Sequence, residues 1–514
     1  MLLARHRAAV LVLAATSTAC IFSSMRVTTL PRPTTPVYVQ TPVKAHLADG
    51  SVILYRQGVN VTADSLLGNG VRFDLTLKDS VPLQAHALAD VVGMEVFRTD
   101  VDGAATFVGS TLGIAVSAAG AALLAIAIFG SCPTVYTDTG AGLSLQAESF
   151  SYSIAPLFEM RDVDGIVVRP DSTGRFVVEI RNEALETHNI NQLEVLEARH
   201  RAGELVMPDA ANRLVALSNL AEVVTARDRS GADRRDLLSF ADGRAFRTSR
   251  TMLDSAAHGE LEDWIDVTVA RPGADSAALL LRLRNSLLNT VLLYDVLLGG
   301  RGAGSLDWLG GDLNHIGEAT RLGQWYHTRM GLRVAVREDG RWRGVGRIPD
   351  TGPIAWKDVA LVVPVPRGED SLRIRLSFVA DNWRIDQARV AGLVRRPAVR
   401  ALTPTAVAWQ DGPPDSTALT AVLSPDDRYL RTLPGQRIGV TWDAGPAPAG
   451  DSRTFFLAAQ GYYTEWIRAE WLTRDTRVRS GATQDDLLRL ALADWRVEQP
   501  DFERRFYRSR VEVR

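Results

Sequence analysis

Apolar and polar residues alternate along several short segments of the chain, most of them after residue 130. Such alternation is typical of a strand with one buried face and one solvated face. Turn signals such as Asp339-Gly340 and Pro434-Gly435 lie between these segments. The clearest alternating sets are Phe176, Val178 and Ile180; Leu332, Val334 and Val336; and Leu372, Ile374, Leu376 and Phe378. The pattern predicts a mainly β fold of antiparallel sandwich or roll domains with a few helices.

Three segments have the spacing of helices. They are residues 213–226, 286–298 and 485–497, and the last of these places Leu488 and Trp495 on one face. We expect a helix in each of them.

One segment is apolar without interruption. Residues 103–137 carry no charged side chain, and residues 107–129 are apolar or small throughout. This length permits a membrane span. A buried helix or helical hairpin is the alternative, because Gly and Ala allow close packing and add little hydrophobic drive. We therefore predict one apolar helical segment over 103–130, either in a membrane or buried.

The N-terminus has the pattern of a secretory signal. Two arginines precede the apolar run 8–15, which is too short to span a bilayer. The segment ends in Ser17-Thr18-Ala19-Cys20. This ending resembles a bacterial lipoprotein signal, in which the cysteine is diacylated and becomes the mature N-terminus. The resemblance implies lipidation of Cys20, which leaves Cys132 as the one remaining cysteine and no intrachain disulfide.

These patterns divide the chain into seven expected segments. They are a signal peptide (1–19), the lipidated Cys20 with a Thr/Pro-rich tether (20–42), a small β-rich module (43–102), the apolar segment (103–130), a β-rich domain (131–230), a β-sandwich-like domain (231–400) and a C-terminal β-rich module with a helix near 485–497 (401–514).

Composition excludes several classes of protein. The chain has 514 residues, of which 46% are hydrophobic and 23% charged, so wholesale disorder and a polytopic membrane protein are disfavoured. The 58 Lys+Arg and 60 Asp+Glu give a net charge of -2, which leaves no excess for binding phosphates. We expect no nucleic-acid partner. Lys44, Lys78 and Lys357 are the only lysines.

Residues 130–200 resemble a region of uncharacterised bacterial envelope proteins. The likeness begins at Ser131-Cys132-Pro133-Thr134-Val135-Tyr136, after the apolar segment, and it is most marked at Asn182-Glu183-Ala184-Leu185-Glu186-Thr187-His188-Asn189. The resemblance implies an envelope location and a β fold. It implies no established activity, so no catalytic residue can be carried over.

Motifs for common chemistry are missing from the sequence. It contains no phosphate-binding or dinucleotide-binding glycine motif in the required context, no Gly-x-Ser-x-Gly elbow, and no paired His or Cys spacing for zinc. Asp307, Asp312 and Asn314 lie in a glycine-containing loop, but their spacing matches no defined ion site. We therefore expect no cofactor, no metal site and no catalytic residue.

Tryptophan is concentrated in the second half, where ten of the eleven lie after residue 300. Exposed aromatic rings can stack on the apolar faces of sugars. The alternative is that they fill sandwich cores, as Trp442 would in continuing the series Ile438, Val440. The aromatic residues expected to be exposed for ligand binding are Trp325, Tyr326, Tyr462, Tyr463 and Trp466.

Together these features predict a non-enzymatic, lipid-anchored cell-envelope protein of structural or interaction type. It would face the extracytoplasmic side, in the periplasm or at the outer membrane. Its expected partners are the membrane, through the N-terminal lipid and residues 107–129, and an envelope glycan or protein. Two alternatives stay open: a carbohydrate- or cell-wall-binding protein that uses the Trp-rich half, and a glycoside-active enzyme, which requires two facing carboxylates in a cleft.

Overall fold

The structure is a computed structural model. It describes residues 23–29, 36–40, 43–47, 52–55, 57–73, 80–101, 133–154, 156–184, 186–256, 259, 261–304, 308, 316–426, 428–446, 452–465, 475–479 and 481–508. The predicted signal peptide, Cys20, the apolar segment 103–130, Asp307, Asp312, Asn314 and Trp466 lie outside these residues. Among the described helices, none combines the length and hydropathy needed to cross a membrane.

The chain divides into two compact units, and the first is built on one antiparallel sheet. Its strands are β1 (Ser23–Thr29), β2 (Val37–Val39), β3 (Val43–Leu47), β4 (Val52–Tyr55), β5 (Val59–Val61), β6 (Ser65–Phe73), β7 (Ser80–Ala87) and β8 (Val91–Val101). They run in the order β1-β8-β3-β4-β6-β5-β2, with β7 on β6. A small core that includes Ile53, Tyr55 and Met94 covers one face.

The expected tether 20–42 is not an unpaired spacer throughout, because two parts of it are strands of this sheet. Ser23–Thr29 pairs residue by residue with Val101–Glu95 of β8, and Val37–Val39 pairs with β5. Backbone N–H and C=O groups at a sheet edge form hydrogen bonds with any segment that adds as a further strand. The Thr/Pro-rich composition of the segment does not indicate such pairing.

The second unit contains a β-sandwich. Its strands are β9 (Thr134–Asp138), β10 (Leu143–Glu148), β11 (Met160–Ile166), β12 (Arg175–Arg181), β13 (Glu186–His200), β23 (Ala398–Leu402), β24 (Ala406–Trp409), β25 (Leu430–Thr432), β26 (Arg437–Asp443) and β27 (Ser452–Glu465). One sheet has the order β10-β9-β12-β26-β24 and the other β11-β27-β13-β23, with β25 on β13. Inward side chains such as Phe176, Ile180 and Trp442 form its core, which confirms the predicted alternation.

The second unit also contains a nine-stranded antiparallel sheet. Its strands are β14 (Leu205–Pro208), β15 (Leu214–Asp228), β16 (Glu262–Ala270), β17 (Ser276–Asn285), β18 (Leu332–Glu338), β19 (Arg341–Ile348), β20 (Lys357–Pro364), β21 (Ser371–Val379) and β22 (Trp383–Arg395). The order is β19-β18-β21-β16-β15-β22-β17-β20, with β14 on β15. The end strands β19 and β20 lie next to each other, so the sheet is nearly closed into a barrel. The mainly β, antiparallel fold class is confirmed.

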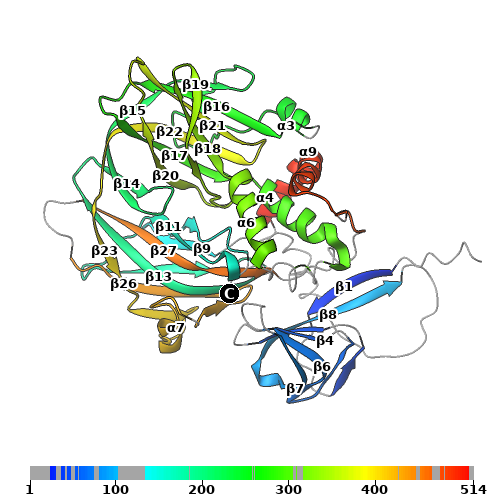
Figure 1. Ribbon diagram of the computed structural model, residues 1–514. Coiled ribbons are helices and arrows are strands. Elements are labelled where there is room, and N and C mark those ends of the chain that lie inside the picture. Colours follow the sequence, from blue (N-terminus) through cyan, green and yellow to red (C-terminus); the bar gives the residue numbers. More distant parts are fainter. Residues whose placement is uncertain are drawn as a thin grey trace, which may run out of the picture. The chain divides into compact units, whose positions relative to one another are not determined.

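Helices lie at the edges of these sheets (Figure 1). They are α3 (Arg250–Ala256), α4 (Leu288–Thr290) with a π-helical turn (Val291–Leu298), α6 (Ile316–Met330), α7 (Ser416–Thr420) and α9 (Gln484–Arg508), besides short 3-10 turns at Leu88–Asp90, Pro156–Phe158, Arg235–Leu237 and Gly299–Gly304. The helices predicted at 286–298 and 485–497 are confirmed. The one predicted at 213–226 is wrong, because that segment is β15, which pairs with β14, β16 and β22.

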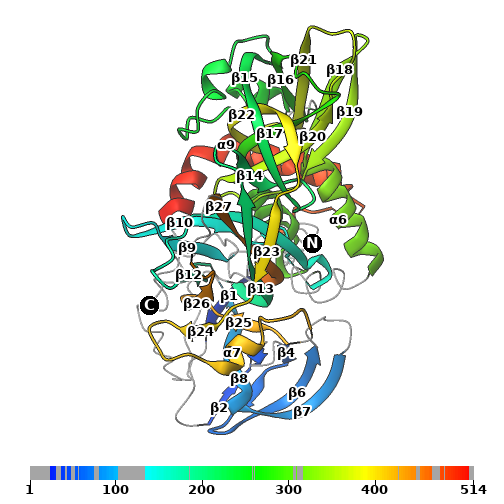
Figure 2. The same ribbon diagram turned by 90° about the vertical axis from the view of Figure 1, so that its left-hand side faces the viewer.

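The barrel sheet is an insertion in the sandwich, and this differs from the expected domain boundaries. Strands β9–β13 and β23–β27 share the sandwich sheets, whereas β14–β22 lie between them in the chain. The segments expected as separate domains at 131–230 and 401–514 therefore belong largely to one sandwich. The chain leaves the sandwich after β13 and enters the barrel sheet at β14, and it returns from β22 to the sandwich at β23. Figure 2 shows β14 and β23, the strands that these two connections lead into, side by side. An ion pair between Arg395 and Glu204 joins them.

Candidate functional site

A pocket with a volume of about 600 Å³ lies where the sandwich, the barrel sheet and two helices meet. We call it the junction pocket. Its walls come from the end of β10, the connection into β11, the β14–β15 turn, α4 with the π-helical turn, α6, the loop 349–353 and β27. This volume is within the range of small-molecule sites.

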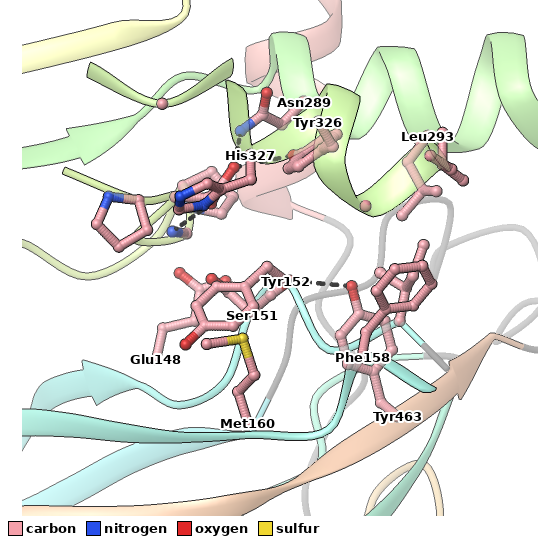
Figure 3. A pocket seen from close by; sticks show the side chains of 18 of the residues that line it. Glu148, Ser151, Tyr152, Phe158, Met160, Asn289, Leu293, Tyr326, His327 and Tyr463 are labelled. Atoms are coloured by element: carbon pink, nitrogen blue, oxygen red, sulfur yellow. Dashed lines mark hydrogen bonds between the residues drawn. The ribbon is translucent and has the colours of Figure 1, made fainter. Parts of the chain in front are cut away.

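Much of the pocket surface is apolar. Phe158, Met160, Leu293, Leu297 and Leu322 are among the residues that line it. Figure 3 shows Phe158 and Met160 on one side of the space and Leu293 on the opposite side. A ligand placed there would exchange water for apolar side chains on both sides, which favours an apolar molecule.

Two of the predicted aromatic residues meet in this pocket. Tyr326, from α6, donates a hydrogen bond to Oδ2 of Asp350 over 2.9 Å, and Tyr463, from β27, donates to the backbone oxygen of Ser151 over 3.1 Å. Tyr463 is only 2% exposed, so the prediction of an exposed residue is wrong, although it does line the pocket. Its strand is covered on both faces.

The other predicted aromatics are placed elsewhere. The indole of Trp325 donates to Oδ1 of Asp485 over 3.1 Å, which directs it to α9. Tyr462 is 2% exposed, contrary to expectation, because its ring packs edge-on against Tyr429. Trp466 is outside the described residues.

Asp350 is the acidic group at the helical side of the pocket. Besides the Tyr326 hydroxyl, the side-chain amide of Asn289 and the backbone N–H of Gly352 donate hydrogen bonds to it. All three donors are neutral, and no basic side chain in the described part of the chain forms an ion pair with it. Burial, with the nearby charge of Asp162, raises the pKa of Asp350 to about 6. Sequence reasoning missed this residue, because Asp350 precedes Gly352-Pro353 in what resembles an ordinary turn.

Glu148 ties the sandwich to the same loop. Its Oε2 accepts hydrogen bonds from the backbone N–H groups of Ile354, over 2.7 Å, and Ala355. Gly352 has φ +84°, and a Cβ there would lie 2.5 Å from Oε2 of Glu148. Only glycine fits both the backbone conformation and the space, so position 352 is needed for this wall of the pocket.

A buried ion cluster behind the pocket joins β20 to β11. Nζ of Lys357 lies 2.5 Å from Oδ1 of Asp162 and 2.9 Å from Oδ1 of Asp164, and the three side chains are at most 10% exposed. Burial and the neighbouring Asp162 raise the pKa of Asp164 to about 7, although Lys357 opposes the shift. Burial also raises the pKa of the nearby Tyr152, with added effects from these carboxylates. The cluster fixes the sandwich against the barrel sheet.

A second polar group has the order of a nucleophile–base–acid triad. The hydroxyl of Thr432 lies 3.1 Å from Nδ1 of His188, whose Nε2 lies 2.7 Å from Oε1 of Glu186. All three residues are at most 1% exposed, and none of them lines the junction pocket. Burial lowers the pKa of His188 to about 3, so the ring is neutral. We interpret this group as a structural network inside the sandwich.

The tryptophans do not form an open platform in the described part of the chain. Trp383, Trp442 and Trp495 are fully buried, which confirms the core role predicted for Trp442. The guanidinium of Arg375 lies 4.7 Å from the ring centre of Trp264 and 4.5 Å from that of Trp342. Arginine therefore covers faces of these two rings that a sugar would need.

No cluster of three or more His, Cys, Asp or Glu side chains suited to a metal ion occurs among the residues described. The weak candidates Asp307, Asp312 and Asn314 are not among them.

Comparison with known proteins gives no family. No protein-family model matches the chain, and no curated protein matches it. A GH31 alpha-xylosidase from Xanthomonas citri is similar over 85% of this chain, with 8% identity and a TM-score of 0.16, and the match covers 34% of that enzyme. The chain thus spans about a third of the xylosidase. A secreted serine protease from Vibrio cholerae is similar over 74% of this chain and 98% of its own, with 8% identity and a TM-score of 0.11. Both scores are too low to indicate a shared fold.

Proposed function

We propose that this chain is a lipid-anchored cell-envelope protein that binds a small, largely apolar molecule in the junction pocket without converting it. The observation that carries the binding proposal is the pocket itself, with about 600 Å³ of space and apolar side chains on opposite sides. A site of this kind binds its ligand mainly by removing apolar surface from water.

The roles of the polar side chains support the proposal that the bound molecule is not converted. Glu148 holds the backbone of the 349–355 loop, and Asp350 accepts from three neutral donors that fix α4, α6 and the same loop. The triad-like group of Thr432, His188 and Glu186 is inside the sandwich, where a substrate has no room. Each of these arrangements has a structural purpose.

Filling the pocket tests the binding proposal. Leu293→Trp is expected to weaken the binding of Nile red, a neutral apolar dye, at least about tenfold, because a buried indole takes up the space that the ligand would use. Binding is measured by dye fluorescence on the purified chain. Leu393→Trp is the matched control, since Leu393 is 54% exposed on β22. Equal affinity in both variants, or no binding by the wild type, would contradict the proposal.

Cys20 tests the anchor. In cells that secrete the protein, Cys20→Ala is expected to move most of it from the membrane fraction to the soluble extracytoplasmic fraction, because the acyl chains are lost. Cys132→Ala is the control and should stay with the membrane. A protein that remains membrane-bound after Cys20→Ala would point to residues 107–129 as the anchor. A C-terminal tag that resists protease until the cells are lysed would refute the extracytoplasmic location.

A glycoside-active enzyme is the second candidate. It is favoured by one observation, that Glu148 and Asp350 both line the pocket while the pKa of Asp350 is raised to about 6. Acid–base hydrolysis of a glycoside requires two carboxyl groups at the site, one of them an acid with a raised pKa. Turnover of chromogenic glycosides by the wild type that disappears in Glu148→Gln would establish this candidate in place of simple binding.

A further inference from the structure

We propose that the ligand of the junction pocket is an amphiphile with a protonated amine, and that Asp350 binds this amine. The inference rests on the proposed function, since it names the chemistry of the molecule that the pocket would hold.

Asp350 is a carboxyl group for which the described residues supply no ionic partner. Its hydrogen-bond donors are Tyr326 on α6, Asn289 on α4, and the backbone of Gly352 in its own loop. Asp162 on β11 and Tyr152 in the connection into β11 also lie close enough to interact with it electrostatically. A carboxylate removed from water is normally paired with a cation. Asp162 and Asp164 behind it follow this rule through Lys357. Asp350 faces the pocket instead, where a bound cation could supply the pairing.

Two further acceptors at the pocket lack a donor in the described structure. Asn289 is 8% exposed and its Oδ1 accepts no hydrogen bond, while its Nδ2 holds Asp350. The hydroxyl oxygen of Ser151, on the sandwich side, is also buried without a partner. A buried polar atom without a partner costs free energy, which a ligand can recover by supplying the missing hydrogen bond. An ammonium group has three donors and no acceptor.

The remaining charges at the pocket also favour a cation. Arg161 is paired with Glu194 over 3.0 Å, and Arg213 is paired with Asp209 over 3.0 Å. Partial burial and the charge of Arg347 lower the pKa of His327, which keeps that ring neutral at pH 7. Glu148 and Asp350 add negative charge. An anionic amphiphile such as a fatty acid would therefore be repelled, whereas an amine is attracted.

The geometry also assigns the ligand's other end. The apolar side chains of Phe158 and Met160 lie across the space from Tyr326 and Asn289, the two side chains that hold the carboxyl group of Asp350 (Figure 3). An alkyl or aromatic body fits there, while the amine lies toward α4 and the 349–353 loop. The ligand class is thus a long-chain or aromatic primary amine.

Three eight-carbon probes test this on the full-length protein by displacing Nile red. At pH 7.5, octylamine is expected to bind about tenfold tighter than 1-octanol, from the hydrogen bonds of a charged donor, and octanoate weaker than either. In Asp350→Asn the advantage of octylamine over octanol should fall to about one. Asp370→Asn, an exposed carboxylate in the turn before β21, is the control and should keep the advantage.

Acidification of the wild type tests the same point without a substitution. The carboxyl group of Asp350 is charged above its pKa of about 6 and neutral below it, so the octylamine advantage should shrink from pH 7.5 to pH 5. Equal binding of octylamine and octanol at pH 7.5, or an advantage that survives in Asp350→Asn, overturns the amine assignment. Failure of octanol and Nile red to bind at all would instead refute the proposed function, so the two failures are distinguishable.

Discussion

Replacing Lys357 by Met is expected to lower the free energy of unfolding by about 3–5 kcal/mol. The ammonium group is held between Asp162 and Asp164, and the side chains of all three are nearly buried. Methionine fills the space of the lysine stem but leaves two carboxyl groups facing each other without a cation. Without the ammonium group Asp164 takes up a proton, and the buried charge of Asp162 that stays unpaired destabilises the variant more than the loss of attraction itself.

Two comparisons decide whether this explanation holds. In the triple variant Lys357→Met, Asp162→Asn, Asp164→Asn, most of the lost stability should return, because no buried charge remains. Arg367→Met should change stability by less than about 0.5 kcal/mol, since Arg367 and its partner Asp275 are 85% and 76% exposed. Urea unfolding followed by tryptophan fluorescence measures all three. A triple variant no more stable than Lys357→Met would show that the cluster acts through its shape rather than its charge.

Trp495→Ala is expected to cost about 3–5 kcal/mol of stability, as for other buried aromatic side chains. Trp495 is 0% exposed, and its ring meets Phe502 edge-on. Its indole N–H donates to Oδ2 of Asp381 over 2.8 Å, a carboxylate that also pairs with the buried Arg384 over 2.7 Å. The substitution therefore opens a cavity and removes one of the donors that hold α9 on the barrel sheet.

Trp495→Phe separates the two contributions. It keeps most of the ring packing and loses the hydrogen bond, so we expect a cost of about 1–2 kcal/mol. Val497→Ala on the same helix is the control: Val497 is 68% exposed, and its loss should stay within about 0.5 kcal/mol. Thermal and urea unfolding give the measurements. Equal losses for Trp495→Ala and Val497→Ala would contradict the placement of this helix.

Strands with one solvated face were predictable from the sequence, and strands covered on both faces were not. β12, β18 and β21 show the alternation of buried and less buried positions that was read from their residues. Nearly every position of β13 and most positions of β27 are buried, because one face packs in the sandwich and the other contributes to a second cluster with Leu214. Period-two patterning disappears in such strands.

The segment that carries the resemblance to envelope proteins has a structural explanation. Asn182 donates to the backbone oxygens of Glu186 and Thr432, and Glu183 accepts from Thr134 and Tyr136. Polar residues in this run satisfy one another inside the sandwich, as buried polar groups must. A polar motif of this kind can serve packing alone and indicates no reaction.

Only some of the residues that line the junction pocket could be predicted from the sequence. Tyr326 and Tyr463 were chosen as aromatic residues near the surface, but it is the strand order that brings them to one space. Asp350 and Asn289 lie 61 residues apart and carry no local motif. The site forms because the fold brings together residues that are far apart in the chain, and a single sequence does not show which of them will meet.

The insertion of the barrel sheet into the sandwich sets the order in which paired strands become available during synthesis. β12 pairs with β26, and β13 pairs along its whole length with β27 (Figure 1). These partners are separated in the chain by the entire barrel sheet, so β12 and β13 emerge from the ribosome long before β26 and β27 do. Until then their open edges are templates for pairing with other chains. The sandwich therefore closes only after the strands of the barrel sheet have been made, and a chaperone that shields nascent strand edges would raise the yield of folded protein.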